Sequence, residues 1–270
     1  MKIARATAHY VLLCLCSVVI LFPVAYALLM SLMDGAAILS GRLWPEKGTL
    51  VNYEAAFQQA PLGRYLWNSF FVAFMITVGR LIVSSLAAFA FVFLRFPGRD
   101  RWFYVCIATM LVPWEATVIP NFLTIQALGW TNHYAGLIVP FWAMAFGIFL
   151  LRQQFKQIPH ELYEAAQLSG MGNFRFFCRV VLPLSKTSLV TLAVYSFLDA
   201  WNMYLWPLLV TNDDRVRTVQ IGLKQLQTQE IASSWGVVMA AAVIAMLPTL
   251  LLLFAGQKQL RKGLMQGAIQ

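Results

Sequence analysis

Charged residues are scarce in this chain of 270 residues. Asp, Glu, Lys and Arg together make up 11% of it, against about 25% in an average soluble domain. Hydrophobic residues make up 60%, and a soluble chain of that composition would expose large apolar patches. The composition also excludes an intrinsically disordered chain, which has few apolar residues and a high net charge. The sequence therefore predicts an integral membrane protein.

Cysteine and histidine are equally scarce, which bears on metal and redox chemistry. The chain has four cysteines and three histidines: Cys14, Cys16, Cys106, Cys178, His9, His133 and His160. So few cysteines exclude a small scaffold held together by disulfides. Cys14 and Cys16 lie in an apolar run and every histidine stands alone, so we expect no disulfide, no metal site and no catalytic histidine. An intramembrane enzyme is not expected either, because no Ser/His or Asp pair has a suitable spacing.

The phosphate-binding motif G-x-x-x-x-G-K-[ST] is absent from the sequence. Its backbone N–H groups and lysine hold the phosphates of ATP in proteins that use it. Without it, the chain is not expected to hydrolyse ATP. If transport depends on ATP, the ATPase is a separate subunit.

Long apolar runs are what the chain has in abundance. A helix needs about 20 mostly apolar residues to cross the hydrocarbon layer of a membrane. Six segments reach this length: 10–33, 66–94, 102–127, 134–154, 184–209 and 234–256. A transmembrane barrel would instead show alternating segments of about 10 residues. The sequence predicts an all-α membrane protein, with six transmembrane helices forming one domain over residues 1–270.

The first of these segments has an alternative interpretation as a signal peptide. Lys2 and Arg5 precede the apolar run, and Ala25-Tyr26-Ala27 resembles a cleavage site, which is the layout of a secretory leader. However, the apolar run continues past that site to Met33. We therefore expect a retained first helix.

The distribution of Lys and Arg predicts the orientation, because these residues gather in the cytoplasmic loops of membrane proteins. One side holds both termini and the loops 2–3 and 4–5, with thirteen basic and three acidic residues. The other side holds six basic and six acidic residues. The basic residues of the first side are Lys2, Arg5, Arg95, Arg99, Arg101, Arg152, Lys156, Arg175, Arg179, Lys186, Lys258, Arg261 and Lys262. Both termini should therefore be cytoplasmic.

The cytoplasmic segment between the fourth and fifth spans carries the signals of a short helix. Pro159 suits the first helical position, where no N–H is required. Glu161 and Glu164 fall in the first turns, where the helix dipole favours anions, and Gly170 is a natural stop. Such a helix could insert into a groove of a cytosolic protein. The alternative is an amphipathic connector that lies on the membrane surface.

Three motifs in this chain resemble a known family. The pattern EAAx3Gx9VxLP at 164–183 is similar to the EAA loop of permease subunits of binding-protein-dependent ABC importers, with Val180 where the family usually has Ile. RFPG at 95–98 resembles the turn that follows the family's second span. WNxYLWP at 201–207 resembles the fifth span of the carbohydrate-uptake, maltose-type branch. With Arg80 and a glutamate after a proline, Glu115, the chain looks most like permeases for glycerol-3-phosphate and related phosphodiesters.

The resemblance implies a function and a set of partners. It implies a multi-pass permease of the bacterial cytoplasmic (inner) membrane, for a sugar or polyol-type solute such as glycerol-3-phosphate or a glycerophosphodiester. It implies a second homologous permease, two cytosolic ATPase subunits and a solute-binding protein on the outer face. ATP and Mg would be bound by the ATPase, and this chain would bind no cofactor. The loop 159–183 would contain the coupling helix, and contact with the ATPase would pass to Glu161, Glu164, Ala165, Ala166 and Gly170.

Three ionisable residues fall within the predicted spans: Arg80, Glu115 and Asp199. Charges at that depth are costly, so they usually pair, face the bundle interior or line a pathway. An ion pair of Arg80 with Glu115 or Asp199 is one interpretation, and contact with the solute is the other. Glu115 lies between Pro113 and Pro120, where the helix should bend.

The fifth span carries a polar and aromatic stripe. Tyr195, Asp199, Asn202 and Trp206 recur at i, i+4, i+7 and i+11, so they would share one face of a continuous helix. Aromatic rings and hydrogen-bonding groups suit a sugar or polyol, which favours a pathway lining. Packing between helices, with Trp206 in the interfacial belt, is the alternative.

Two further questions stay open at the level of sequence. Residues 34–65 and 210–233 should form extracytoplasmic loops, and the charged second loop is either a contact for the solute-binding protein or an ordinary solvated loop. Pro248 should kink the sixth span, for gating or for packing. A self-contained, ion-coupled secondary transporter is the rival function, although the inverted repeats typical of that class are not found.

Overall fold

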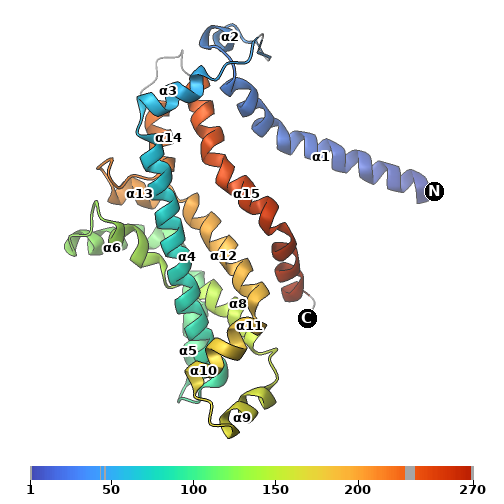
Figure 1. Ribbon diagram of the computed structural model, residues 1–270, viewed down its shortest axis with the longest axis vertical. Coiled ribbons are helices and arrows are strands. Elements are labelled where there is room, and N and C mark those ends of the chain that lie inside the picture. Colours follow the sequence, from blue (N-terminus) through green and yellow to red (C-terminus); the bar gives the residue numbers. More distant parts are fainter. Residues whose placement is uncertain (1, 43, 46, 229–234, 269–270) are drawn as a thin grey trace. The chain divides into compact units, whose positions relative to one another are not determined.

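The computed structural model describes residues 2–42, 44, 45, 47–228 and 235–268, and in them all regular secondary structure is helical (Figure 1). This confirms the all-α prediction. Of the residues used in the charge argument, Glu46 and Glu230 lie outside this description, as do the side chains of Lys2, Arg5, Lys258, Arg261 and Lys262.

Contacts within the chain separate it into two compact units. The first comprises Met1–Leu66 and Val219–Pro248, and the second comprises Trp67–Thr218 and Thr249–Gln270. Two long helices, α4 (Leu62–Phe93) and α15 (Trp235–Ala268), contribute to both.

The first unit contains α1 (Lys2–Ser31), α2 (Gly35–Leu39), α3 (Val51–Gln59) and α14 (Val219–Thr228). The end of α1 is held by α3. Asn52 donates from Nδ2 to the carbonyls of Ser31 and Met33, at 2.9 and 2.7 Å, and Tyr53 and Ser31 share a hydrogen bond of 2.8 Å. These bonds satisfy carbonyls that a helix end leaves without partners. The segments 34–65 and 210–233, predicted as extracytoplasmic loops, contain helices in their described parts, and residues 229–233 lie outside the description.

The second unit holds most of the remaining helices. These are α5 (Arg99–Ala108), α6 (Trp114–Ala127), α7 (Tyr134–Ile138), α8 (Ala145–Phe155), α9 (His160–Leu168), α10 (Asn173–Phe176), α11 (Leu182–Leu184), α12 (Lys186–Trp201) and α13 (Leu205–Val210). Short 3₁₀ turns η1 (Thr109–Leu111) and η2 (Val139–Phe141) and a π-helical turn, η3 (Phe177–Val181), join them. The main core cluster is formed by Ala88, Phe89, Phe93, Leu151, Phe155, Ile158, Ala166, Phe176, Phe177, Val181 and Leu192.

Three helices are long and apolar enough to cross a membrane alone: His9–Ser31, Leu62–Phe93 and Trp235–Gly256. Three further pairs of helices pass the same test together but are bent, by 99°, 43° and 80°. The described part of the chain thus offers three candidate spans, or up to six if each bent pair crosses once.

One of these bends lies at Pro113, where the sequence predicts a bend. The predicted span 102–127 breaks after η1, where Pro113 takes extended backbone with ψ 137° before α6 begins. Proline lacks the N–H that would continue the preceding helix. The predicted span 184–209 also breaks, because α12 ends at Trp201 and α13 begins only at Leu205.

The turn between α4 and α5 shows how the sequence sets one of these ends. Pro97 disfavours helical backbone in the residue before it, and Gly98 adopts a φ of +73°, which glycine tolerates. Arg99, the first residue of α5, donates from Nη1 to the carbonyls of Val92 and Leu94 at 3.3 and 3.5 Å. The turn is therefore tied to the end of α4.

Candidate functional site

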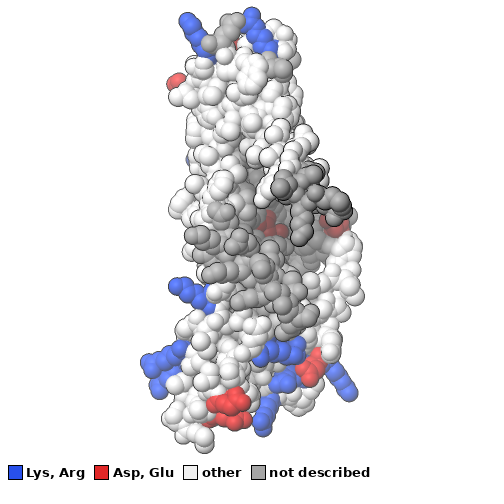
Figure 2. All heavy atoms as spheres, turned by 90° about the vertical axis from the view of Figure 1, so that its right-hand side faces the viewer, with Lys and Arg blue, Asp and Glu red and all other residues white. Residues whose placement is uncertain are grey.

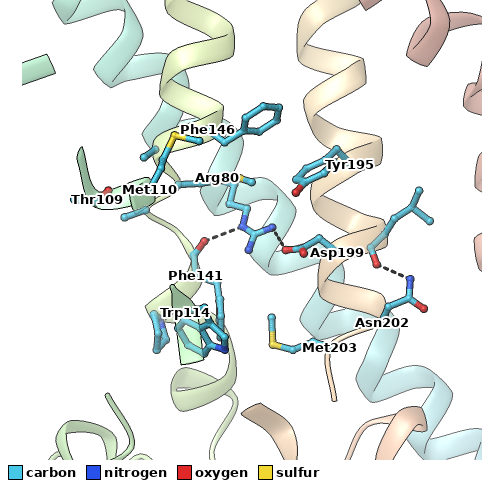
Figure 3. Close-up of a pocket in the computed structure, with 15 residues that line it drawn as sticks. Arg80, Thr109, Met110, Trp114, Phe141, Phe146, Tyr195, Asp199, Asn202 and Met203 are labelled. Atoms are coloured by element: carbon cyan, nitrogen blue, oxygen red, sulfur yellow. Dashed lines mark hydrogen bonds and ion pairs between the residues drawn. The ribbon is translucent and has the colours of Figure 1, made fainter. Parts of the chain in front are cut away.

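A cavity of about 950 Å³ opens in the second unit between α4, η1, η2, α8 and α12. Figure 3 shows Arg80 at its centre, with Phe146 and Met110 to one side and Trp114 and Met203 to the other. Its lining is Arg80, Thr109, Met110, Trp114, Pro140, Phe141, Ala143, Met144, Ala145, Phe146, Tyr195, Leu198, Asp199, Asn202 and Met203.

Arg80 and Asp199 form the charged centre of this cavity. Nη1 of Arg80 lies 2.7 Å from Oδ2 of Asp199, and Nε donates to the carbonyl of Phe141 at 3.0 Å. The Arg80 side chain is only 6% exposed, whereas that of Asp199 is 43% exposed. Of the two alternatives for Arg80, the structure contains the ion pair with Asp199.

The pair keeps a free donor and a free acceptor. Within the described residues, Nη2 of Arg80 and Oδ1 of Asp199 have no hydrogen bond, and neither atom is among the buried unsatisfied ones. Both side chains line the cavity, and that of Asp199 is 43% exposed. A guanidinium donor beside a carboxylate acceptor can bind an anionic group and a hydroxyl at the same time.

The position of the Phe141 carbonyl depends on a close approach of η2 to α4. A Cβ at Gly79 would collide with the indole of Trp142, so a side chain larger than hydrogen does not fit there. Nε1 of Trp142 donates to the carbonyl of Met75 at 3.2 Å. This contact holds the backbone of residues 141 and 142 against α4, next to Arg80.

The predicted stripe of the fifth span is only partly assembled. Tyr195, Asp199 and Asn202 line the cavity, and the ring of Tyr195 packs on Phe146 with centroids 5.3 Å apart. Asn202 also donates from Nδ2 to the carbonyl of Leu198 at 2.7 Å, as Figure 3 shows.

Trp206 does not line this cavity, so for this residue the structure shows the alternative of packing between helices. Because the helix breaks before Leu205, Trp206 lies on α13, fully buried, and donates from Nε1 to the carbonyl of Gly136 at 2.9 Å. Its ring packs edge-on against Trp114 and Phe141, at 5.6 and 5.9 Å. It thus supports two aromatic residues of the cavity wall from behind.

Glu115 is not part of the cavity either. It lies in the first turn of α6, after the sharp bend, and its side chain is exposed. Among the residues the structure describes, it makes no ion pair with Arg80.

Most of the apolar wall of the cavity could not be predicted from the sequence. Met110, Trp114, Phe141, Phe146 and Met203 line the cavity, but they come from five separate segments and follow no common period. Trp114 stands directly after Pro113, and that helix-breaking proline was the only local signal that its surroundings were unusual.

A helix is present in the segment predicted to hold one, and it is α9. Its first residue is His160, so Pro159 precedes the helix as its N-cap instead of occupying the first helical position. Gly170 follows the helix with a φ of +75°, the left-handed conformation that glycine adopts at helix C-termini. Figure 1 shows α9 beyond the end of α4, near α10.

One face of α9 is packed against its own chain. Ala166 belongs to the main core cluster, and the ring of Tyr163 lies 5.4 Å from Phe93 and 5.2 Å from Phe176. Tyr163 also donates from Oη to Oδ1 of Asn173 at 3.0 Å. Ala166 therefore seats the helix and is not available to a partner.

The other face of α9 is open to solvent. It presents Glu161, Glu164, Ala165 and Leu168, the last of them 90% exposed. Figure 2 shows charged side chains gathered at the end of the second unit where α9 and α10 lie. The exposed ones there include Arg95, Asp100, Arg101, Lys156, Glu161, Glu164, Arg175 and Arg179.

The segment 211–218 is a tightly organised loop. Asn132 accepts from the backbone N–H groups of Asn212 and Asp213 at 2.7 and 3.1 Å. Buried Asn68 donates from Nδ2 to the carbonyls of Arg215 and Arg217 at 3.0 and 2.9 Å. These bonds fix the loop backbone from two sides.

Two ion pairs project from this loop. Arg215 lies 2.6 Å from Asp213, and Arg217 lies 2.7 Å from Asp214. Hydrogen bonds from the Arg215 side chain and backbone lower the pKa of Asp213 to about 2. The Asp213 carboxylate is therefore charged at any physiological pH.

The comparison with protein families gives a match over most of the chain. Residues 80–266 match the family described as "Binding-protein-dependent transport system inner membrane component".

Individual proteins are similar over nearly the full length. The chain is 39% identical to "sn-glycerol-3-phosphate transport system permease protein UgpE" of Brucella suis biovar 1 (strain 1330), over 98% of this chain and 97% of that protein. It is 38% identical to the protein of the same name from Shigella flexneri serotype 5b (strain 8401), over 91% of both chains.

A solved structure has the same fold. A chain in the crystal structure of a bacterial ABC transporter involved in the import of the acidic polysaccharide alginate superposes with a TM-score of 0.86 and 26% sequence identity. The superposition covers 94% of this chain and 96% of that one.

Proposed function

The chain belongs to the family of binding-protein-dependent transport system inner membrane components, and from this premise we propose how its parts share the work of import. It is a multi-pass permease subunit of an ABC importer and not an enzyme. ATP is hydrolysed by a separate subunit, and a binding protein delivers the solute. The rival reading as an ion-coupled secondary transporter is therefore wrong.

The chain crosses the inner membrane six times with both termini in the cytoplasm. Each bent helix pair then makes one crossing, and the excess of Lys and Arg at the end with α9 and α10 supports this orientation. The segment 211–218 lies on the opposite face, where its rigid, charged surface contacts the solute-binding protein.

Helix α9 is the coupling helix that docks on the ATPase, within the loop 159–183. Its exposed carboxylates Glu161 and Glu164 contact basic residues of the ATPase, and exposed Ala165 allows a close approach. Buried Ala166 and the turn at Gly170 hold the helix on the permease. In an assembly with a second homologous permease and two ATPases, ATP binding draws the coupling helices together and opens the pathway outward. Hydrolysis returns it to the inward state.

The cavity around Arg80 is this chain's share of the solute pathway. The observation that supports it is the Arg80–Asp199 pair, which offers Nη2 as a donor and Oδ1 as an acceptor. Tyr195 and Asn202 add hydrogen-bonding groups, and the aromatic wall suits the C–H faces of a polyol. A solute with one anionic group and neighbouring hydroxyls satisfies this arrangement.

We infer that the cargo is sn-glycerol-3-phosphate or a related glycerophosphodiester. The named relatives support this choice, and the cavity fits it: the phosphate pairs with Arg80 and a hydroxyl donates to Asp199. Because Arg80 and Asp199 cancel in charge, this cavity supplies no net positive charge. A doubly charged phosphate therefore needs a further cation from the second permease.

Replacing Arg80 tests the cavity. Arg80→Gln should lower uptake of labelled sn-glycerol-3-phosphate into proteoliposomes at least about ten-fold, since a hydrogen bond to a charged group contributes about 1.5–3 kcal/mol and about 1.4 kcal/mol is a factor of ten. Arg64→Gln, which removes an exposed arginine of the same helix, is the control. Equal uptake by the two variants, at equal amounts of complex, would exclude the cavity from the pathway.

Co-purification tests the coupling helix. Glu164→Ala should reduce the amount of ATPase that purifies with the tagged permease, because a carboxylate that contacts the ATPase is lost. Glu54→Ala, which removes an exposed carboxylate on α3, should leave it unchanged. If both variants retain the ATPase fully, Glu164 does not contact it.

A further inference from the structure

Arg152 is a buried charge whose ion-pair partner, among the described residues, comes from another helix. It lies in the last turn of α8 with a side chain 9% exposed, and its Nη2 is 3.2 Å from Oδ1 of Asp100 in the first turn of α5. Its guanidinium carbon lies 3.7 Å from the ring centroid of Phe103, one turn further along α5. Nε of Arg152 is buried and has no hydrogen-bond partner in the described part of the chain. Arg152 thus depends on two side chains of α5.

The surroundings of this contact are firmly packed. Phe103, Phe91 and Ile148 form a buried cluster that joins α5, α4 and α8, and the rings of Phe91 and Phe103 meet edge-on at 5.7 Å. Arg99 ties the start of α5 to the last carbonyls of α4. The three helices are therefore in contact through both apolar and polar groups at this end.

The same two helices lead from this contact to the solute cavity. α5 continues into η1, whose Thr109 and Met110 line the cavity, and α8 begins with Ala145 and Phe146, which line it too. At its other end α8 is followed, after residues 156–159, by α9. In the sequence, Arg152 therefore lies between Phe146, which lines the cavity, and α9.

We propose that Arg152 is a positioning residue that locks α8 to α5, so that a displacement of α9 reaches the cavity wall instead of being absorbed by sliding of α8. This proposal rests on the proposed function, in which α9 docks on the ATPase. Arg152 suits the task because a planar guanidinium can stack on a ring and bond a carboxylate at once. Separating a buried cation from its partner is strongly destabilising, so the pair favours one register of the two helices.

The test measures solute transported per ATP hydrolysed, in proteoliposomes that contain the complete importer and its binding protein. Asp100→Ala, Arg152→Met and the double variant should each lower this ratio at least about five-fold, the lower end of ordinary coupling between sites, while ATP hydrolysis continues. The double variant should be no worse than either single one, because the two residues act as one contact. Arg101→Met, which removes an exposed charge from α5, the helix that carries Asp100, should leave the ratio unchanged.

Asp100→Ala keeps the test valid even if Arg152→Met fails to assemble, because the Asp100 side chain is 63% exposed and fills no core position. An unchanged ratio in Asp100→Ala would overturn the proposal. So would a parallel loss of hydrolysis and transport with less assembled complex, since that indicates a structural role alone. In all these variants the ATPase should still purify with the permease. A loss of coupling in them is therefore distinguishable from the loss of ATPase binding expected for Glu164→Ala.

Discussion

At the scale of single residues, the protein places charge where a neighbour compensates it. Arg80 is nearly buried and takes its counter-ion from Asp199, 119 positions along the chain. Burying an isolated guanidinium would be very costly, so the pair is what permits a cation at this depth. The pair leaves one donor and one acceptor free, and this gives the cavity its polar character.

The pair Asp213–Arg215 belongs to the same scale and predicts a pH dependence. The pKa of Asp213 is lowered to about 2 from the ordinary 3.8. The stability that the charged carboxylate contributes is therefore present above about pH 3.8 and is lost as the pH falls through about 2. Asp213 therefore stays charged between neutral pH and about pH 5. It should cause no change in the association with the solute-binding protein over this range.

Asp213→Asn should weaken that association at most about five-fold, as expected for an exposed ion pair, and by the same factor across this pH range. A pull-down with immobilised binding protein at several pH values measures both effects. A titration near pH 6 that disappears in Asp213→Asn would contradict the assigned charge state.

At the scale of elements, the breaks between helices decide what lines the cavity. The turn at residues 202–204 separates Trp206 from Asp199, and the bend at Pro113 moves Glu115 away from Arg80. Trp114, directly after the bend at Pro113, and Phe141, at the end of η2 before the bend to α8, lie in the wall. In a continuous helix these residues would have pointed elsewhere.

Gly170 and Gly172 offer a matched pair for testing how α9 ends. Gly170 has a φ of +75°, whereas Gly172 has a φ of −68°. At both positions, an added Cβ would have no neighbour within 4 Å. Left-handed backbone costs a residue with a Cβ about 1–2 kcal/mol. Gly170→Ala should therefore disturb α9 and reduce the ATPase that purifies with the permease, whereas Gly172→Ala should not. Equal behaviour of the two variants would show that the turn at Gly170 does not hold α9 in its docking position.

At the scale of the whole molecule, the asymmetry of charge predicts the topology. In a chain whose four cysteines are replaced by alanine, a cysteine at Gln157→Cys should react with a membrane-impermeant thiol reagent only from the cytoplasmic side. A cysteine at Asp214→Cys should react only from the outer side. Both positions are exposed in the described chain, so burial within this chain does not confound the result. The reverse pattern would place the termini outside.

Several features of this protein could be predicted from sequence because they depend on composition and on near neighbours. Membrane insertion follows from the apolar runs, and the short helix α9 follows from its own proline, glutamates and glycine. The motif at 164–183 indicated the family that the comparisons confirm. The proline before Glu115 indicated a bend, although it gave neither its angle nor its effect.

The sequence by itself determined that this is an all-helical permease of an ATP-driven importer, because apolar length and a local motif need no knowledge of distant contacts. Only the tertiary structure decided that Arg80 pairs with Asp199 and not Glu115, that Trp206 packs behind the cavity wall, and that Arg152 takes its counter-ion from α5. These outcomes depend on which helices meet and where they break. A helical period describes one continuous helix, and it holds no information across a bend or between residues that are far apart in the chain.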